Sequence, residues 1–553
     1  MRACRLTLAA AFMLILVVPA GAAVGPFDPG FGRGGKLGIG LGEGPTLAAM
    51  APDPAGGFVL TGSANPAAGE YALIRIGDTG RVDTSFGNWK PDSNRFFPPA
   101  PAVDYHPAAL AARPGGGWVT AGRDASVFAV VAHRADGKVD TTFGSGGIAR
   151  LDLGGDPASA SALSVLPDGR FLVGGEVVRP TSQDHFVVAR LNADGTPDAS
   201  WGASGVAEIA PPDGVMCDEE YADFGVQALL PVSGGSTLVV GTVAHPASDR
   251  PVPALARLRS DGSIDPEFGS GGTQLLRPAL GSGSVVGAVP RGNGGATLGL
   301  TLGDHCDNPT LTHFGAMAVR ANGALDESYG IGGTATVGFP SDVRARAITR
   351  LPGGRIALVG GIGEFPPFIQ REFAVARLMP KGRLDPEFGG GRTCSEVSGG
   401  ETDGPATAVL PLSGRRLLVG GATQSDAGSL ELIRYRGAFP PGGVECFWPE
   451  QPGSGRLRYV QLRAILGRRG RLRLLVGGNR FGSRARFRPV CLGPAGPGNI
   501  LALWDGRVNG RSLKPGSYIT VLELRDARGR LLGRSYPRAI GLSRRASGPR
   551  RSC

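Results

Sequence analysis

A short motif recurs seven times along this chain of 553 residues: an aspartate, two variable residues, an aromatic residue and a glycine. Successive aspartates are separated by 55 to 67 residues. A fixed period of this size indicates one supersecondary unit that is copied and stacked, which excludes a single irregular globule. The motif aspartates are Asp28, Asp83, Asp140, Asp198, Asp265, Asp326 and Asp385. The aromatic residues are Phe31, Phe86, Phe143, Trp201, Phe268, Tyr329 and Phe388.

The third repeat shows what each copy contains. An apolar run at 162–166 ends in a Pro-Asp-Gly turn at 167–169, and a second run follows at 171–175. A third run at 186–191 leads through another turn into the motif at 198–202. Runs of five or six apolar residues between Gly, Pro and Asp predict strands, because helices need longer stretches with fewer breakers. Each repeat is therefore predicted to be a four-stranded antiparallel sheet.

Recurrence in every copy favours a structural role for the motif. We expect the aspartate to fold the backbone locally through its carboxylate, as Asx turns do. The ring is expected to fill the gap between neighbouring sheets, where burial of a large side chain contributes about 1.5–3 kcal/mol. The third strand also carries a recurring cation, namely Arg75, His133, Arg190, Arg257, Arg320, Arg377 and Arg434.

The two ends of the repeat region are complementary partial repeats. The segment from Asp28 to Gly40 supplies only a fourth strand, whereas the last repeat supplies three strands, ending at Tyr435, and no fourth. A propeller pairs such ends to close its ring, but an open β-solenoid has no use for them. The sequence thus predicts an all-β fold, a seven-bladed β-propeller in which Lys36–Gly40 pairs beside Leu430–Tyr435.

These motifs resemble the delta-60 repeat family of bacterial propeller-like repeats. The shared pattern is LxPDGxxLVGG followed by VARLxxDGxxDxxFGxGG, and it covers roughly Phe27 to Tyr435. Departures occur at 86–89, at 201–205 and in the fifth copy around Pro290, which has lost its Asp-Gly turn. The resemblance implies the propeller fold and brings no activity, cofactor or catalytic residue with it.

The N-terminus has the pattern of a secretory leader. Arg2 and Arg5 precede an apolar run at 6–18 and the small residues Ala20-Gly21-Ala22. A charged region, a short apolar region and a small-x-small site predict a signal peptide over 1–22 and an exported, secreted or cell-surface protein. We expect the propeller over 23–437, a second domain over 438–542 and a basic, disordered tail over 543–553.

The second domain differs in composition from the repeats. Around Trp504 to Leu532 it resembles the small immunoglobulin-like domain of flagellar-hook-capping and secreted surface proteins, which implies a β-sandwich without a particular chemistry. From Arg456 onward there are 22 Arg and one Lys against three carboxylates, although the whole chain has a net charge of only +11. The excess fits a solvated face, a patch for anionic envelope polymers, or docking on an acidic propeller. Aromatic residues do not interleave with the arginines, so nucleic acid is not the expected partner.

Six cysteines remain after the leader, an even number compatible with disulfides in an oxidising compartment. Their spacing does not match a zinc site, and no metal or other cofactor is expected. At least one disulfide is expected, either Cys217–Cys306 or Cys446–Cys491.

No nucleophile elbow, phosphate loop or metalloprotease motif occurs in the chain. Five of the six histidines fall in loops that should share one face of the ring, which we call the upper face, and three of them have a neighbouring aspartate. Loops on a rigid scaffold are where sites are built, although polar loops contain such residues anyway. The candidate ligand-binding residues are Asp104, His106, Asp184, His185, His245, Asp304 and His305.

Two classes of function fit these observations. One is a monomeric, non-catalytic exported scaffold that binds a protein or glycan through the upper-face loops and attaches through the basic domain. The other is a secreted propeller enzyme, such as a lyase, glycoside hydrolase or quinone-type dehydrogenase, with its site at the channel mouth. The predicted inner strands at 163–165, 228–230 and 408–410 are apolar or small, which favours binding.

Overall fold

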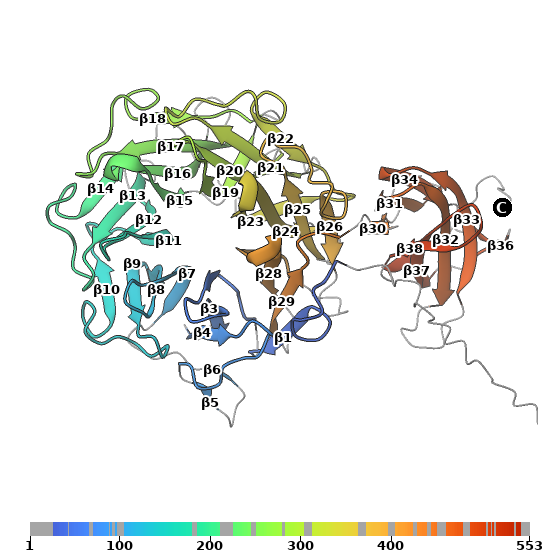
Figure 1. Ribbon diagram of the computed structural model, residues 1–553, viewed down its shortest axis with the longest axis horizontal. Coiled ribbons are helices and arrows are strands. Elements are labelled where there is room, and N and C mark those ends of the chain that lie inside the picture. The colour runs from blue at the N-terminus through green and yellow to red at the C-terminus, as the bar shows by residue number, and fades with distance from the viewer. Residues whose placement is uncertain are drawn as a thin grey trace, which may run out of the picture.

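The computed structural model is all-β, with seven sheets around a common axis and two further sheets to one side (Figure 1). It describes residues 26–41, 44–65, 70–87, 89–90, 95–96, 104–179, 185–210, 225–244, 250–278, 282–303, 312–362, 372–395, 404–423, 428–439, 444–450, 460–478, 487–504, 507–509, 511–513, 516–535 and 538–542. The leader, the basic tail and the cysteines 217, 306 and 553 lie outside these ranges.

Each of the seven sheets is a blade whose strands follow one another antiparallel from the axis outward. Blade 1 contains β2 (Ala49–Pro52), β3 (Phe58–Asn65) and β4 (Glu70–Ile76). Blade 2 contains β7 (Tyr105–Ala112), β8 (Trp118–Asp124), β9 (Val127–His133) and β10 (Ile148–Leu151). Blade 3 contains β11 (Ala158–Val165), β12 (Phe171–Val177), β13 (His185–Leu191) and β14 (Val206–Ile209). Blade 4 contains β15 (Gly225–Pro231), β16 (Thr237–Ala244), β17 (Pro251–Leu258) and β18 (Thr273–Leu275).

The remaining blades follow the same order. Blade 5 contains β19 (Gly283–Pro290), β20 (Ala296–Leu302), β21 (His313–Val319) and β22 (Thr334–Val337). Blade 6 contains β23 (Val343–Leu351), β24 (Arg355–Ile362), β25 (Glu372–Leu378) and β26 (Arg392–Ser395). Blade 7 contains β27 (Ala406–Pro411), β28 (Leu417–Ala422), β29 (Ser429–Tyr435) and β1 (Lys36–Gly40). Short 3-10 turns join the first two strands of blades 4, 6 and 7, namely η2 (Ser233–Gly235), η3 (Pro352–Gly354) and η4 (Ser413–Arg415).

The ring closes through its N-terminal strand, as predicted. Strand β1 pairs antiparallel with β29 from Lys36 opposite Ile433 to Gly40 opposite Ser429. Blade 7 is thus built from both ends of the repeat region, and this pairing covers the edge that β29 would otherwise expose.

Blade 1 departs from the four-stranded prediction. Within the described residues its sheet has three strands, and the chain after the motif forms a separate pair, β5 (Trp89–Lys90) with β6 (Arg95–Phe96). This repeat has Trp89 two residues after the motif glycine, where the other six copies have Gly or Ser, so it lacks the small residue of the tight turn that starts a fourth strand elsewhere.

The motif aspartate and the third-strand arginine form an ion pair inside the blade. In five blades Nε of the arginine lies 2.6–3.0 Å from a carboxylate oxygen, and the guanidinium lies over the motif ring at 4.7–5.4 Å from its centroid. The other carboxylate oxygen accepts a backbone N–H two residues on, which folds an Asx turn. The pairs are Asp28 with Arg434, Asp83 with Arg75, Asp198 with Arg190, Asp265 with Arg257, and Asp385 with Arg377.

The motif also joins each blade to the next. All seven rings are at most 2% exposed, and the motif glycine donates to a backbone carbonyl of the following blade at 2.7–3.3 Å. In the turn that this bond reaches, Gly262 has φ +88°, and a Cβ there would lie 2.7 Å from the Trp201 ring. Only glycine fits both that backbone conformation and the close approach of the ring.

Blade 2 has no third-strand arginine. His133 takes the place and is fully buried, and burial lowers its pKa to about 4, so it is neutral at physiological pH. Arg113, from the first turn of the blade, pairs with Asp140 at 2.7 Å and lies over the Phe143 ring instead. The carboxylate is therefore neutralised from a different strand.

The C-terminal region is a two-layer β-sandwich. One sheet contains β30 (Val444–Glu450), β31 (Val460–Leu466) and β34 (Gly498–Trp504). The other contains β32 (Gly470–Gly478), β33 (Arg488–Ala495), β37 (Gly516–Arg525), β38 (Leu531–Arg534) and β39 (Arg538–Leu542), and a small hairpin joins β35 (Arg507–Val508) to β36 (Arg511–Ser512). Leu462, Leu474, Trp504 and Leu522 are among the side chains that fill the space between the layers.

The sandwich is fixed to the outer edge of blade 6. A disulfide joins Cys394 of β26 to Cys446 of β30, with a Cα–Cα distance of 5.3 Å. Arg392 donates to the side chain of Asn499 in β34 at 2.7 Å. Phe439 packs on Phe388 with ring centroids 4.8 Å apart, so propeller packing extends two residues past the predicted boundary at 437.

The observed disulfide confirms that the mature cysteines form a cross-link and corrects the pairing. Cys446 pairs with Cys394, so the predicted pair Cys446–Cys491 is wrong, although Cys491 is also disulfide-bonded. Spacing along the chain suggested a bond inside the second domain, whereas the fold brings blade 6 against β30. The other predicted pair, Cys217–Cys306, lies outside the described residues.

Replacing Cys394 and Cys446 together by Ser should lower the free energy of unfolding by about 2–4 kcal/mol, because the cross-link restricts the unfolded chain. Denaturant unfolding of the double variant measures the loss. Arg392→Ala, which keeps the disulfide and removes the side-chain hydrogen bonds to Asn499 and to the carbonyl of Gly338, should cost less. Equal stability of the double variant and the parent would contradict this account of the junction.

Candidate functional site

The upper-face candidates in blade 2 form a local cluster. His106 lies 2.9 Å from the Asp104 carboxylate through Nε2. The backbone N–H of Asp104 donates to Asp124 at 3.1 Å, and Arg150 also donates to Asp124 at 2.8 Å. These bonds tie the start of β7 to the end of β8 and to β10.

The candidate in blade 3 belongs to a second cluster. His185 lies 2.5 Å from Glu208 through Nδ1, and Arg179 bridges Glu208 and Asp156, with 2.7 Å to each. The hydrogen bond from Arg179 is the main reason that the pKa of Glu208 lies below its ordinary value, although burial opposes this. Glu208 is therefore held ionised, which suits an ion pair and does not suit a general acid.

These two clusters belong to different blades. No bond joins His106 to His185 among the described residues, and Asp184, His245, Asp304 and His305 lie outside them. Within the described ranges, no group of three or more His, Cys, Asp and Glu is arranged to hold a metal ion. The described part of the upper face thus presents intra-blade ion pairs.

The innermost strands line the axis of the ring. In six blades the first strand has a one-residue β-bulge in its pairing with the second strand, at equivalent positions. Side chains at these bulges help to join blades: the hydroxyl of Ser161 donates to the carbonyl of Val226, and that of Thr407 donates to Leu47 at 2.7 Å. The bulged residues are Ala108, Ser161, Gln227, Val286, Arg346 and Thr407. Most inner strands are apolar or small, as expected, but β23 carries Arg344, Arg346 and Arg350.

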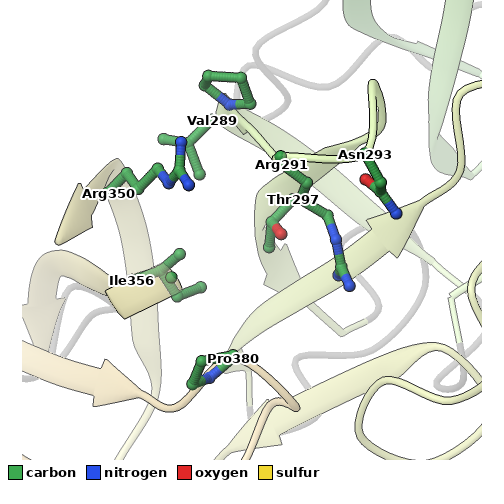
Figure 2. A pocket seen from close by; sticks show the side chains of 10 residues that line it. Val289, Arg291, Asn293, Thr297, Arg350, Ile356 and Pro380 are labelled. Atoms are coloured by element: carbon green, nitrogen blue, oxygen red, sulfur yellow. The ribbon is translucent and has the colours of Figure 1, made fainter. Parts of the chain in front are cut away.

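Two cavities open on the face opposite the predicted loops, which we call the lower face. The first, of about 260 Å³, lies between blades 5 and 6; Figure 2 shows Arg350 and Ile356 on one side and Arg291, Asn293 and Thr297 on the other. The second, of about 480 Å³, lies between blades 6 and 7. Arg350 lines both cavities. The sequence patterns did not reveal this place, because it depends on turns that are about 60 residues apart in the chain.

The outer face of the five-stranded sandwich sheet carries four arginines around one carboxylate. Strand pairing sets Arg473 of β32 directly opposite Glu523 of β37, and Arg471 opposite Arg525. On the other side of β37, Glu523 lies opposite Arg534 of β38. Opposed residues share a face of the sheet, so these five side chains form one group, which we call the arginine face.

Glu523 is the buried centre of the arginine face. Its side chain is 1% exposed and accepts hydrogen bonds from Arg525 at 2.9 Å and from Arg534. Burial would raise the pKa of Glu523, but the bonds and charges of Arg534 and Arg525 hold it below the ordinary value. The group therefore keeps three more positive than negative charges at neutral pH. Arg471 is exposed and Arg473 half-buried.

Another arginine of the sandwich faces the propeller. Burial raises the pKa of Asp342, which precedes β23, and the charge of Arg463 in β31 is among the influences that partly offset this rise. The arginine face lies on the other sheet of the sandwich.

Two segments of the repeat region, 166–200 and 235–268, match a family model described as a domain of unknown function (DUF5122) beta-propeller. No curated protein sequence matches the chain. The described part of the chain contains no helix that is long and apolar enough to cross a bilayer.

The solved structures that resemble the chain do so only distantly. The extracellular domain of a putative one-component system from B. thetaiotaomicron has 10% identity and a TM-score of 0.38, over 91% of this chain and 57% of that one. Prolyl oligopeptidase B from Galerina marginata has 10% identity and a TM-score of 0.34, over 78% and 56%. A hypothetical protein from Leishmania major has 8% identity and a TM-score of 0.26, over 50% and 82%. The chain therefore spans little more than half of the first of these proteins, and at such scores the likeness carries no argument about activity. Blades 3 and 4 thus contain the two segments that match the DUF5122 beta-propeller model.

Proposed function

We propose that this protein is an exported, non-catalytic binding scaffold that attaches to anionic surface material, such as an envelope polymer, through the arginine face of its sandwich domain. The propeller is then the rigid body that presents ligand-binding surfaces away from the attachment point. The observation that carries the proposal is the group of four arginines around Glu523 on an open sheet face.

The arginine face suits a polymer with repeated negative charges. Arg525 and Arg534 are oriented by Glu523, whereas Arg471 and Arg473 have no ion-pair partner within the described residues. Guanidinium groups offer forked donors that match phosphate and carboxylate. A row of them on adjacent strands, about 4.8 Å apart, can meet successive charges of an extended polymer.

Three features support the remaining parts of the proposal. The Cys394–Cys446 bond is the kind that persists in oxidising compartments outside the cytosol, which agrees with the leader pattern. The same bond holds the sandwich at a fixed place on blade 6, as attachment requires. Two of the described upper-face histidines, His106 and His185, each pair with a carboxylate of their own blade and do not converge on one site, which supports a binding role over catalysis at the channel mouth.

The test is retention of the whole mature chain on immobilised polyphosphate in a salt gradient. If about four arginines each release a counterion, the logarithm of affinity should fall with the logarithm of salt with a slope of about −3, or roughly 60-fold between 50 and 200 mM. Replacing Arg471 and Arg473 together by Gln should roughly halve this slope.

The matched control removes the same charge elsewhere. Arg488 and Arg511 are exposed and lie off the arginine face, so their double replacement by Gln should shift elution much less. Equal shifts for the two double variants would show that only net charge matters. Retention that persists at high salt would also contradict the proposal.

A further inference from the structure

Arg350 interrupts a ring of uncharged residues on the lower face of the propeller. In each blade the first strand ends in a turn, closed in six blades by a hydrogen bond from the backbone N–H of one residue to the carbonyl four residues on. In blade 6, Leu351 pairs with Arg355 at the same place. The residue just before this bond in blades 1 to 7 is Pro52, Ala112, Val165, Pro231, Pro290, Arg350 and Pro411.

The fold does not require a cation at this position, because six blades form the same turn without one. The neighbouring lower-face cations have structural tasks: Arg291 donates to Asp326 at 3.0 Å, and Arg355 donates to Asp385 at 2.9 Å. Arg350 is exposed and forms no hydrogen bond or ion pair within the described part of the chain. Its charge is therefore available to a ligand.

The two cavities beside Arg350 define what such a ligand looks like. Neither is lined by a carboxylate, so nothing in them competes for the guanidinium. Toward blade 5 the apolar lining is Val289, Pro290, Ile356 and Pro380. Toward blade 7 it is Leu351, Pro352, Pro411 and Leu412. A cation with an apolar hollow on each side complements a carboxylate with an apolar group on each side.

We infer that the lower face is a peptide-binding site in which Arg350 holds an Asp or Glu side chain and the two cavities take the apolar residues that flank it. Asn293 adds a second donor in the first cavity, since its carbonyl oxygen already accepts the N–H of Gly295 at 3.2 Å and its amide N–H groups remain to donate. The lining contains no aromatic side chain, so the site favours aliphatic neighbours. This site is separate from the arginine face and does not depend on it.

Fluorescence anisotropy with labelled Gly-Leu-Asp-Leu-Gly amide, on the whole mature chain, tests the inference. Arg350→Val, which installs the residue of blade 3, should fold normally and weaken binding at least about tenfold, since charge-assisted hydrogen bonds are lost. Arg350→Lys should bind between the two, because a point charge lacks the fork. The matched control is Arg81→Val, an exposed arginine on the same face in blade 1, which should bind within about twofold of the parent.

Two further probes separate the alternatives. Gly-Leu-Asn-Leu-Gly amide, which has the same shape without the charge, should bind as weakly to the parent as the Asp peptide binds to Arg350→Val. An oligogalacturonate of similar length carries the carboxylate on a sugar and should not compete with the peptide. Equal binding of the Asn and Asp peptides, unchanged binding by Arg350→Val, or Arg350-dependent binding of the sugar acid alone would each overturn the assignment.

Discussion

Deleting residues 26–41 should convert the protein from a soluble species into one that aggregates at micromolar concentration. The deletion removes β1 and uncovers the edge of β29, which carries the buried side chains Leu430 and Leu432. It also removes Phe31, Ile39 and Leu41, which are at most 7% exposed. At about 1.5–3 kcal/mol for each side chain, the loss approaches the whole stability of a typical domain, about 5–15 kcal/mol. Light scattering and thermal unfolding measure both effects.

Addition of the missing strand in trans is the control for this deletion. A synthetic peptide of residues 26–41 should pair with β29 and restore solubility, whereas a scrambled peptide of the same composition should not. A deleted protein that stays monodisperse with an unchanged unfolding temperature would contradict closure by β1.

Replacing Asp385 by Ala should lower the free energy of unfolding by about 3–5 kcal/mol. The Arg377 and Asp385 side chains are both 0% exposed, and Arg355 donates to the same carboxylate oxygen at 2.9 Å. Removal of the carboxylate leaves a fully buried guanidinium without its counter-charge, which costs more than the pair itself contributes. Urea unfolding gives the difference.

The equivalent pair in blade 1 provides an internal comparison. Arg75 and Asp83 have the same relative positions, but each side chain is 29% exposed. Water can solvate the arginine after Asp83→Ala, so we expect loss of the ion pair to lower the free energy of unfolding by only about 1 kcal/mol. Loss of the Asx turn adds a similar cost in both variants. Similar losses in the two blades would show that burial does not set the cost.

The repeat architecture could be predicted from the sequence because its signals are local and are repeated seven times. Apolar runs between Gly, Pro and Asp set the strands, and the partial repeats at the two ends predicted that β1 would pair with β29. The prediction of a fourth strand is wrong for blade 1 within the described residues, because the chain after Gly87 departs from the repeat pattern and forms β5 and β6. The strands were predicted from features that several repeats share, and a feature that occurs in one repeat only has no such support.

The candidate sites were harder to predict because they depend on contacts between blades. The histidines are easy to identify in the sequence by residue type. In the structure, however, His106 pairs with a carboxylate of blade 2 and His185 with one of blade 3, so the two do not form one site. Arg350 did not stand out, since arginine is common in this chain. It becomes distinctive only when the seven first-strand ends are superposed by their turns. An alignment of the repeats on those turns could have shown it.

Sequence alone determined the period, the blade count and the closing strand, because each follows from short-range patterning and from the number of strands at the two ends. The tertiary structure decided which cation neutralises each aspartate, as Arg113 in place of His133 shows, and which cysteines meet. Both outcomes depend on distances between segments far apart in the chain. Cys394 and Cys446 are 52 residues apart in the chain. Their Cα atoms lie 5.3 Å from each other only because the sandwich packs against blade 6.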